Sequence, residues 1–218
     1  MEFELIDDTA MLRFDDGKVN AIGHDFIDAI NEGLDRAESE AKAVIILGRK
    51  DRFSAGFDLD EFKKGAQATQ KLLKRGTEMF LRLYSHGQPI IAGCTGHAIA
   101  AGAFILLAAD TRIGTTGNYK LGLNETAIGS PFPVFGHELA GSRLSKRHLT
   151  AALVQSKMYD PAGAVDAGFL DEVVAAADLE SRCLAIASDL AALPAKTYAI
   201  NKRDSRADSI QKIQSSLA

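Results

Sequence analysis

Two turns built from very small residues are the first candidates for chemistry in this sequence. Ala100-Ala101-Gly102 follows an apolar run with strand character and leads into the apolar segment Phe104–Asp110, which has helical length. N–H groups at a helix start bind anionic oxygen, and small residues let another molecule approach the backbone closely. Ala55-Gly56-Phe57 has the same character and leads into Asp58, a residue type that caps helices. These turns are candidates for an oxyanion hole, and the alternative is that their small residues only allow close helix packing.

An oxyanion hole would require the two turns to meet. If adjacent strands deliver both turns to the same end of a sheet, their N–H groups converge on one oxygen, and each donor stabilises a developing negative charge by roughly 3 kcal/mol. Other catalytic patterns are not evident in the sequence. Ser54 lacks the context of a nucleophile elbow, and His97 is interpreted as a hydrogen-bonded structural residue.

Composition restricts the class of protein. The chain has 218 residues, 46% of them hydrophobic and 25% charged, as expected for a globular protein with one sizeable core. The net charge of −4 and the interspersed charges favour neither nucleic acid nor a membrane as partner. Cys94 and Cys183 lack metal-ligand spacing, so no metal is expected. Because Met1-Glu2-Phe3-Glu4 has no basic flank followed by an apolar stretch, we expect a cytoplasmic location.

The alternation of strand and helix patterns predicts an α/β fold with crossover connections. Apolar periodicity gives the positions of these elements. Strands are expected on both sides of a turn within 3–14 and at 43–48, 89–94, 111–113 and 169–174, and helices at 20–37, 67–85, 104–110, 134–139, 146–153, 179–193 and from 195 onward. The run at 43–48 is continuously apolar, which indicates a strand buried on both faces.

Four motifs in order resemble those of the crotonase superfamily, the enoyl-CoA hydratases and isomerases. Arg52-Phe-Ser-Ala-Gly-Phe-Asp-Leu59 resembles the first oxyanion motif of that family, and Gly96-His-Ala-Ile-Ala-Ala-Gly-Ala103, with Asp110 closing the helix, resembles the second. Asp15–Ala21 is similar to its early Asn-Ala segment, and Pro161–Asp171 to a later alanine-rich stretch. The resemblance covers about residues 3 to 200.

The resemblance implies a crotonase-like α/β fold, with a spiral core of ββα repeats at 1–190 and a short C-terminal helical segment at 191–218. It implies a coenzyme A thioester as substrate, no other cofactor, no metal, and a homotrimer or a dimer of trimers. The oxyanion donors fall on the N–H groups of Phe57 and Ala101, where the family usually has glycine at the second position. The substrate-binding residues implied with them are Ala55, Gly56, Asp58, Leu59, Ala100, Gly102, Phe104, Asn124, Pro131 and Phe132.

The number of carboxylates separates the subclasses of this family. Hydratases resemble one another in having two catalytic glutamates, and here the first position is Phe104 while Gly122-Leu-Asn-Glu125 supplies the second. Adding water is convenient with two carboxylates, whereas one base is enough to remove a C2 proton and return it to C4. The stretch Tyr119–Thr126 is also similar to that of mitochondrial Δ3,Δ2-enoyl-CoA isomerases. The resemblance therefore favours an isomerase with Glu125 as the proton shuttle.

Alternatives remain at the level of the sequence. Glu125 could be a loop carboxylate that only neutralises local charge, and Glu138 could be a second acid, although its helical position favours a solvated side chain. Pro133 occupies the place where dienoyl isomerases carry a further acid, which argues against that subclass. An enoyl-CoA hydratase of fatty-acid oxidation and a catalytically silent acyl-CoA binder stay open. An apolar pocket that includes Phe104 should raise the pKa of Glu125.

Two departures from the family pattern concern the acyl pocket. Hydratases typically have a Pro-Gly-x-Gly-Gly turn after the glutamate loop, and here the chain has Ser130-Pro-Phe-Pro-Val-Phe135. Its two prolines stiffen a bulky aromatic wall. The chain also ends at Ala218, where many family members have further helices, so the roof of the pocket and the assembly are expected to differ.

Overall fold

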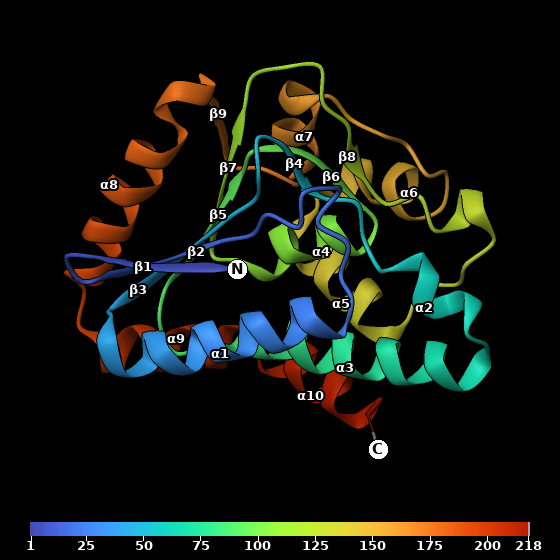
Figure 1. The fold of residues 1–218 in the computed structure, drawn as a ribbon, viewed down its shortest axis with the longest axis horizontal. Coiled ribbons are helices and arrows are strands. Elements are labelled where there is room, and N and C mark those ends of the chain that lie inside the picture. The colour runs from blue at the N-terminus through green and yellow to red at the C-terminus, as the bar shows by residue number, and fades with distance from the viewer. Residues whose placement is uncertain (218) are drawn as a thin grey trace.

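A six-stranded sheet forms the middle of the molecule (Figure 1). The computed structural model describes residues 1–217, and Ala218, the last residue of the expected C-terminal segment, lies outside the described residues. The first strand is antiparallel to the second, and all other neighbours are parallel. In sheet order the strands are β1 (Glu2–Ile6), β2 (Thr9–Arg13), β3 (Ala43–Leu47), β5 (Ile90–Cys94), β7 (Thr111–Thr115) and β9 (Glu172–Val174).

A second, three-stranded parallel sheet carries the candidate chemistry. Its strands are β4 (Asp51–Ser54), β6 (Gly96–Ile99) and β8 (Leu121–Gly122). Each of them follows a strand of the large sheet and precedes a helix, so the chain repeats a ββα unit three times. The expected crotonase-like α/β fold is confirmed. These three strands are not evident in the sequence, because segments of two to four residues carry almost no periodicity.

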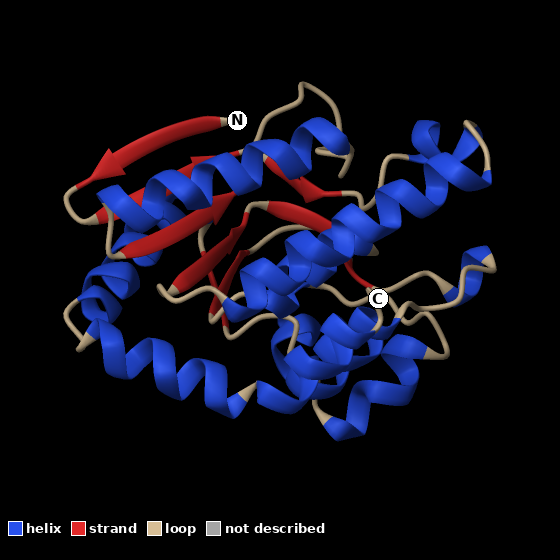
Figure 2. Cartoon of the chain, turned by 90° about the horizontal axis from the view of Figure 1, so that it is seen from below, coloured by secondary structure: helices blue, strands red, loops and turns tan. Residues whose placement is uncertain are grey.

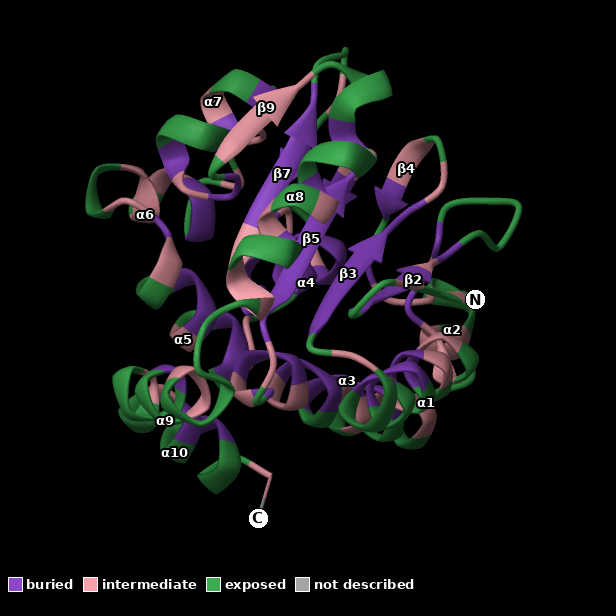
Figure 3. Cartoon of the chain, turned by 90° about the vertical axis from the view of Figure 1, so that its left-hand side faces the viewer, coloured by how far each residue is buried: buried purple, intermediate pink, exposed green. Residues whose placement is uncertain are grey.

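The helices cover both faces of the large sheet. Their bounds are α1 (His24–Glu40), α2 (Leu59–Lys63), α3 (Ala66–Ser85), α4 (Ala101–Ala108), α5 (Val134–Arg143), α6 (Lys146–Leu153), α7 (Pro161–Ala167), α8 (Leu179–Ala191), α9 (Ala195–Ser205) and α10 (Ala207–Ser215), with 3₁₀ turns at Thr126–Ile128 and Ala176–Asp178. Figure 2, seen from below, looks onto helices that cover one face of the large sheet. Figure 3 shows α8 in front of the buried strands, on the opposite face of that sheet.

Strand β3 is buried on both faces, as its continuous apolar run predicts. Val44 and Ile46 belong to the large core that includes α1, α3 and α4, whereas Ile45 and Leu47 pack in a second core with α8. Successive side chains point to opposite faces of a strand, so five apolar residues serve two cores. Full burial of each such side chain contributes about 1.5–3 kcal/mol, and helices on both faces are required to obtain it.

Two predicted boundaries are wrong because local hydrogen bonds override periodicity. The helix expected from Asn20 begins at His24, because Asn20 has a φ of 53° and its buried side-chain amide donates to the carbonyls of Phe14 (2.9 Å) and Phe53 (3.2 Å). The strand expected from Phe169 begins at Glu172, because the N–H of Phe169 still bonds the α7 carbonyl of Ala164 at 2.8 Å. Asn20 thereby ties its loop to the end of β4.

Helix α4 begins three residues earlier than its apolar run predicts, at Ala101 rather than at Phe104. Ala100 precedes it with a φ of 53° and a ψ of −126°, a conformation that is costly for a residue with a side chain. Gly102 then lies directly against β4, where an added Cβ would overlap the carbonyl group of Ser54. The small residues therefore do allow close packing, and they also place the first turn of α4 at the end of the small sheet.

We expect Gly102→Ala to destabilise the protein by about 1–3 kcal/mol, because the new methyl group must displace the β4 backbone. Gly141→Ala is the matched control, because that α5 glycine has no atom within 4 Å of an added Cβ. There the change should stabilise the helix by about 0.5–1 kcal/mol. Urea unfolding of both variants measures the difference, and equal effects would contradict this packing role.

The C-terminal helices return to the core. Helix α10 packs against α3 and α5, and Figure 1 shows both C-terminal helices below the sheet. Asp110, at the end of α4, accepts hydrogen bonds from Lys202 of α9 and from Arg206 between α9 and α10, both at 2.7 Å. All three side chains are largely buried, so this ion cluster fixes the expected helical segment 191–218 over its described residues. The proposed boundary at residue 190 stays a prediction.

Candidate active site

The two small-residue turns meet at the same end of the small sheet. Strands β4 and β6 are parallel neighbours, with Ser54 opposite Ala98, so the turns that follow them leave in the same direction. A Cβ added to Gly56 would lie 3.3 Å from the backbone nitrogen of Ala101 and 3.1 Å from the carbonyl oxygen of Ile99. The Gly56 turn and the start of α4 are therefore in contact.

Two N–H groups in these turns are left without an acceptor. Among residues 1–217, neither the N–H of Phe57 nor that of Ala101 donates a hydrogen bond. Their neighbours are occupied: the N–H of Asp58 donates to the carbonyl of Ile22 at 3.1 Å, and that of Ala100 to Gly122 at 2.9 Å. The neighbouring amides thus hold the two turns in place, and these two donors within the turns stay free of the described residues.

A cavity of about 350 Å³ opens beside these donors. Ten of the residues implied by the resemblance line it: Ala55, Phe57, Leu59, Ala100, Ala101, Phe104, Asn124, Glu125, Pro131 and Phe132. Six further residues complete the wall: Phe62, Leu73, Ile128, Ser130, Pro133 and Phe135. Ser130, Pro133 and Phe135 belong to the stretch that the sequence predicts as a stiff aromatic wall of the acyl pocket, whereas Phe62, Leu73 and Ile128 were not predicted as pocket residues. The only sequence signal for Leu73 was its place in a predicted helix, which does not say what that helix face covers.

Three implied substrate-binding residues do not line this cavity. Gly56 adopts a φ of 98°, which its turn requires, and Gly102 packs on Ser54. Each glycine therefore determines the shape of a turn without facing the cavity. Asp58 caps α2, where its carboxylate accepts a hydrogen bond from the N–H of Asp60 at 2.9 Å. The structure gives these three residues a role in positioning the cavity wall.

Glu125 brings a buried carboxylate into the cavity. It directly precedes the 3₁₀ turn Thr126–Ile128, and only 9% of its surface is exposed. Its Oε2 atom and the Oδ1 atom of Asn124 are buried without a hydrogen-bond partner in the described part of the chain. Burial raises the pKa of Glu125 to about 7, although the N–H groups of Glu125 and Asn124 partly oppose the shift. The expected direction of the shift agrees with this geometry.

The loop that carries Glu125 is held from outside the cavity. Thr126 Oγ1 donates to the carbonyl of Leu153 at 2.9 Å, and the N–H of Ala127 donates to Ser156 Oγ at 3.0 Å. The first two residues of the turn are therefore anchored to the end of α6 and to the segment that follows it. Among residues 1–217 no hydrogen bond restrains Glu125 Oε2 itself, so the position of this atom follows from the loop backbone and from the packing around the buried side chain.

Aromatic rings form the inner end of the cavity. Phe104 lies 6.1 Å from Phe80 and 5.3 Å from Phe135, measured between ring centroids, and Phe80 stacks on Phe135 at 4.8 Å. All three rings are fully buried, whereas Phe132 on the 130–133 loop is half-buried. The position where the sequence lacks a second glutamate is thus part of a rigid apolar floor.

Two other candidates are accounted for outside the cavity. His97 Nδ1 accepts a hydrogen bond from the N–H of Lys120 at 3.0 Å, in keeping with a structural histidine. Glu138 was expected to be solvated, and this is wrong: its carboxylate accepts a hydrogen bond from Ser209 at 2.8 Å and pairs with Lys212 at 3.1 Å. Glu138 therefore holds α10 against α5.

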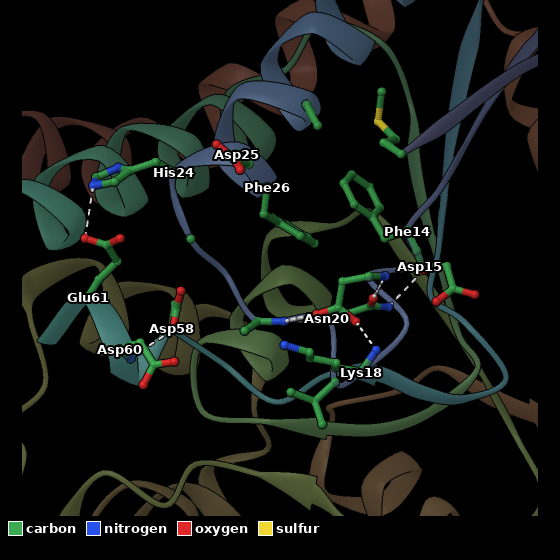
Figure 4. Close-up of a pocket in the computed structure, with 16 residues that line it drawn as sticks. Phe14, Asp15, Lys18, Asn20, His24, Asp25, Phe26, Asp58, Asp60 and Glu61 are labelled. Atoms are coloured by element: carbon green, nitrogen blue, oxygen red, sulfur yellow. Dashed lines mark hydrogen bonds and ion pairs between the residues drawn. The ribbon is translucent and has the colours of Figure 1, made fainter. Parts of the chain in front are cut away.

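A larger cleft of about 740 Å³ lies between the segment that starts α1 and the beginning of α2 (Figure 4). Its charged lining residues are Asp15, Asp16, Lys18, His24, Asp25, Asp58, Asp60 and Glu61. Figure 4 shows Glu61 beside His24, with 3.9 Å between His24 Nε2 and a carboxylate oxygen of Glu61, and Asp58 beside Asp60. These groups hold one another and nearby amides, and carboxylates predominate. An apolar acyl chain is better accommodated by the smaller, aromatic cavity.

Among residues 1–217, no group of three or more His, Cys, Asp or Glu side chains is placed to hold a metal ion. No single helix there is long and apolar enough to cross a membrane, and one bent pair, Ala176–Ala191 with Ala195–Ser205, passes by length and composition alone.

Comparison with known proteins identifies the family. The family profile described as enoyl-CoA hydratase/isomerase matches residues 7–217. The chain belongs to the enoyl-CoA hydratase/isomerase family. This family acts on acyl-CoA substrates and includes both isomerases and hydratases.

Some relatives are named as isomerases and others as hydratases. Human mitochondrial enoyl-CoA delta isomerase 1 is 27% identical over 190 residues, covering 85% of this chain and 63% of the human protein. A probable enoyl-CoA hydratase of Bacillus subtilis is 33% identical over 55% of the chain and 48% of its own length. The chain therefore spans less than two thirds of either relative. The crystal structure of an enoyl-CoA hydratase/isomerase family protein from Pseudomonas syringae superimposes with a TM-score of 0.96, with 39% identity over 99% of this chain and 94% of that one.

Proposed function

We propose that this enoyl-CoA hydratase/isomerase family member converts 3-enoyl-CoA to 2-enoyl-CoA thioesters, with Glu125 as the single base. The observation that carries the proposal is one buried carboxylate, with an oxygen that has no hydrogen-bond partner among residues 1–217, in an apolar cavity lined also by the residues of the two free N–H donors. Phe57 and Ala101 supply the oxyanion hole. The thioester brings coenzyme A as part of the substrate, and the reaction as written requires no further cofactor or metal.

Each step follows from these groups. The thioester oxygen accepts hydrogen bonds from the N–H groups of Phe57 and Ala101, which makes the C2 proton more acidic. The Glu125 carboxylate removes that proton, and the electron pair spreads over the enolate and the adjacent C3–C4 double bond. Protonated Glu125 then returns the proton to C4, and the double bond forms between C2 and C3. No water takes part, and the carboxylate is regenerated.

The pH dependence of turnover should report Glu125. Because burial raises the pKa of Glu125 to about 7, the carboxylate that accepts the first proton is depleted below that pH. We expect kcat/KM for a 3-enoyl-CoA to rise with pH through about 7 and then level off, since the profile of kcat/KM reports the free enzyme. A stopped or continuous assay from pH 5 to 9 measures it. A flat profile across this range would contradict the role of Glu125.

A substrate panel separates isomerisation from its alternatives. A 3-enoyl-CoA gives the conjugated chromophore when it is isomerised, whereas a 2-enoyl-CoA loses that chromophore when water is added. We expect the first reaction to be faster. Faster hydration would favour the hydratase alternative, which the name of the Bacillus subtilis relative supports. Stabilisation by acyl-CoA without turnover of either substrate would indicate a silent binder.

Phe104→Glu tests why a single glutamate favours isomerisation. The new carboxylate would lie in the cavity with Glu125, where the pair could hold a water molecule. We expect weaker isomerase activity, a gain in hydration of short 2-enoyl-CoA, and a loss of stability of a few kcal/mol from burying a second charge. Phe104→Leu is the matched control without a charge and should gain no hydration. Wild-type protein that already hydrates faster than it isomerises would contradict this explanation.

Two expectations stay predictions: the homotrimer or dimer of trimers, and the cytoplasmic location.

A further inference from the structure

A second apolar groove lies behind the wall of the cavity. It measures about 380 Å³ and runs along α6 beside the Glu125 loop. Its lining residues are Thr126, Phe132, His137, Leu149, Thr150, Leu153 and Val154. None of them is a lysine, arginine or carboxylate, and Val154 at the end of the groove is 62% exposed. Apolar lining with few polar groups is typical of sites that take an apolar ligand.

Phe132 separates the groove from the candidate acyl cavity, because its side chain lines both. Its ring centroid lies 6.2 Å from that of Phe104 on the cavity side and 5.7 Å from that of His137 on the groove side. Gly136 lies beneath it, where an added Cβ would be only 3.2 Å from the ring. Among the described residues, Phe132 is therefore the one that lines both spaces.

This ring is the part of the wall that can move. Phe104 and Phe135 are fully buried and packed against Phe80, so displacing either would open the core. Phe132 is half-buried on a loop, and rotation of a partly exposed side chain takes place on the picosecond to nanosecond scale. Pro131 and Pro133 hold the backbone on either side, so a change of rotamer moves the ring without moving the loop.

We infer that the groove along α6 binds the distal part of a long unbranched acyl chain, and that Phe132 is the specificity-determining residue at its entrance. This inference rests on the proposed function, because it assumes that the first cavity holds the thioester end of the substrate. The occupant is an alkyl chain because the groove shares the wall residue Phe132 with that cavity, is lined mainly by apolar side chains, and contains no lysine, arginine or carboxylate. Short chains end in the first cavity, and long chains displace the ring and continue along Leu149 and Leu153.

The first test compares chain lengths. The ratio of kcat/KM for 3-hexadecenoyl-CoA to that for 3-hexenoyl-CoA is measured in wild-type protein, Phe132→Ala, Leu149→Trp and the double variant. Because a single methylene in an apolar pocket changes kcat/KM by about tenfold or more, we expect Phe132→Ala to raise the ratio at least about tenfold. Leu149→Trp should lower it by filling the groove, and should cancel the gain in the double variant.

Val165→Trp is the control, because it places the same bulky side chain on the exposed surface of α7 and should leave the ratio unchanged. A double variant that keeps the full gain of Phe132→Ala would overturn the inference, since the chain would then leave the cavity by another route. An unchanged ratio in Phe132→Ala would overturn it as well.

A labelling experiment tests the groove without turnover. Cys94 and Cys183 are both buried, so a thiol reagent should react selectively with Val154→Cys. We expect saturated hexadecanoyl-CoA to slow the labelling at least about tenfold and butanoyl-CoA to leave it unchanged, because only the long chain buries this position. Equal protection by both, protection by neither, or a cysteine that is inaccessible without ligand would overturn the inference. If no 3-enoyl-CoA is isomerised, the proposed function fails, and this measurement still decides the groove.

Discussion

Glu125→Gln should lower isomerase turnover by at least about 10²-fold while acyl-CoA affinity changes little, because the amide keeps the size of the side chain and cannot accept the C2 proton. Single-turnover conversion of a 3-enoyl-CoA and binding of a saturated acyl-CoA measure the two quantities separately. Glu138→Gln is the matched control, because Glu138 contacts α10 and does not line the cavity. Unchanged turnover in Glu125→Gln would exclude this residue from the reaction.

The same variant should be more stable than wild type above neutral pH. Burial raises the pKa of Glu125 from 4.5 to about 7, so between these values the folded protein binds more protons than the unfolded chain does. Stability therefore falls as pH rises through this window, and above it the ionised carboxylate costs about 3 kcal/mol. Glu125→Gln removes this cost, and urea unfolding at pH 5 and pH 8 measures it. Greater stability together with lost activity would rule out misfolding as the cause.

Ala101→Pro should lower kcat by about 10²–10³-fold, the usual effect of losing one oxyanion donor. Proline removes the N–H of Ala101, which has no acceptor among the described residues, so no internal hydrogen bond is lost. Ala101 is also the first residue of α4, the helical position that proline tolerates best. Steady-state kinetics and circular dichroism together check the result.

Ala101→Gly is the matched control for the oxyanion donor. It keeps the N–H and removes only a methyl group, so its activity should stay close to that of wild type. An Ala101→Pro variant that is folded and fully active would contradict the assignment of the Ala101 N–H to the oxyanion hole. Should the proline variant be misfolded, Ala101→Gly still tests the proposal, because a large loss there would show that the side chain and not the N–H matters.

Much of the candidate site could be predicted from the sequence because its determinants are local. The turns of tiny residues before apolar runs, the cap at Asp58 and the single Glu125 in its short motif are each contained within a few residues. The strand at β3 was evident for the same reason, since burial on both faces leaves a continuous apolar run. These features specify the kind of chemistry and the class of fold.

Only the tertiary structure decided how these pieces meet. The pairing of β4 with β6 brings the two turns into contact, although the strands are about 40 residues apart and too short to be periodic. The raised pKa of Glu125 depends on its burial in a cavity lined by residues from distant parts of the chain, and the groove beyond Phe132 depends on α6, which follows that residue in the chain. Local patterns determine which groups are available. Distances, burial and free donors arise from contacts between distant segments, because the free energy that selects those contacts is gained by the whole core at once.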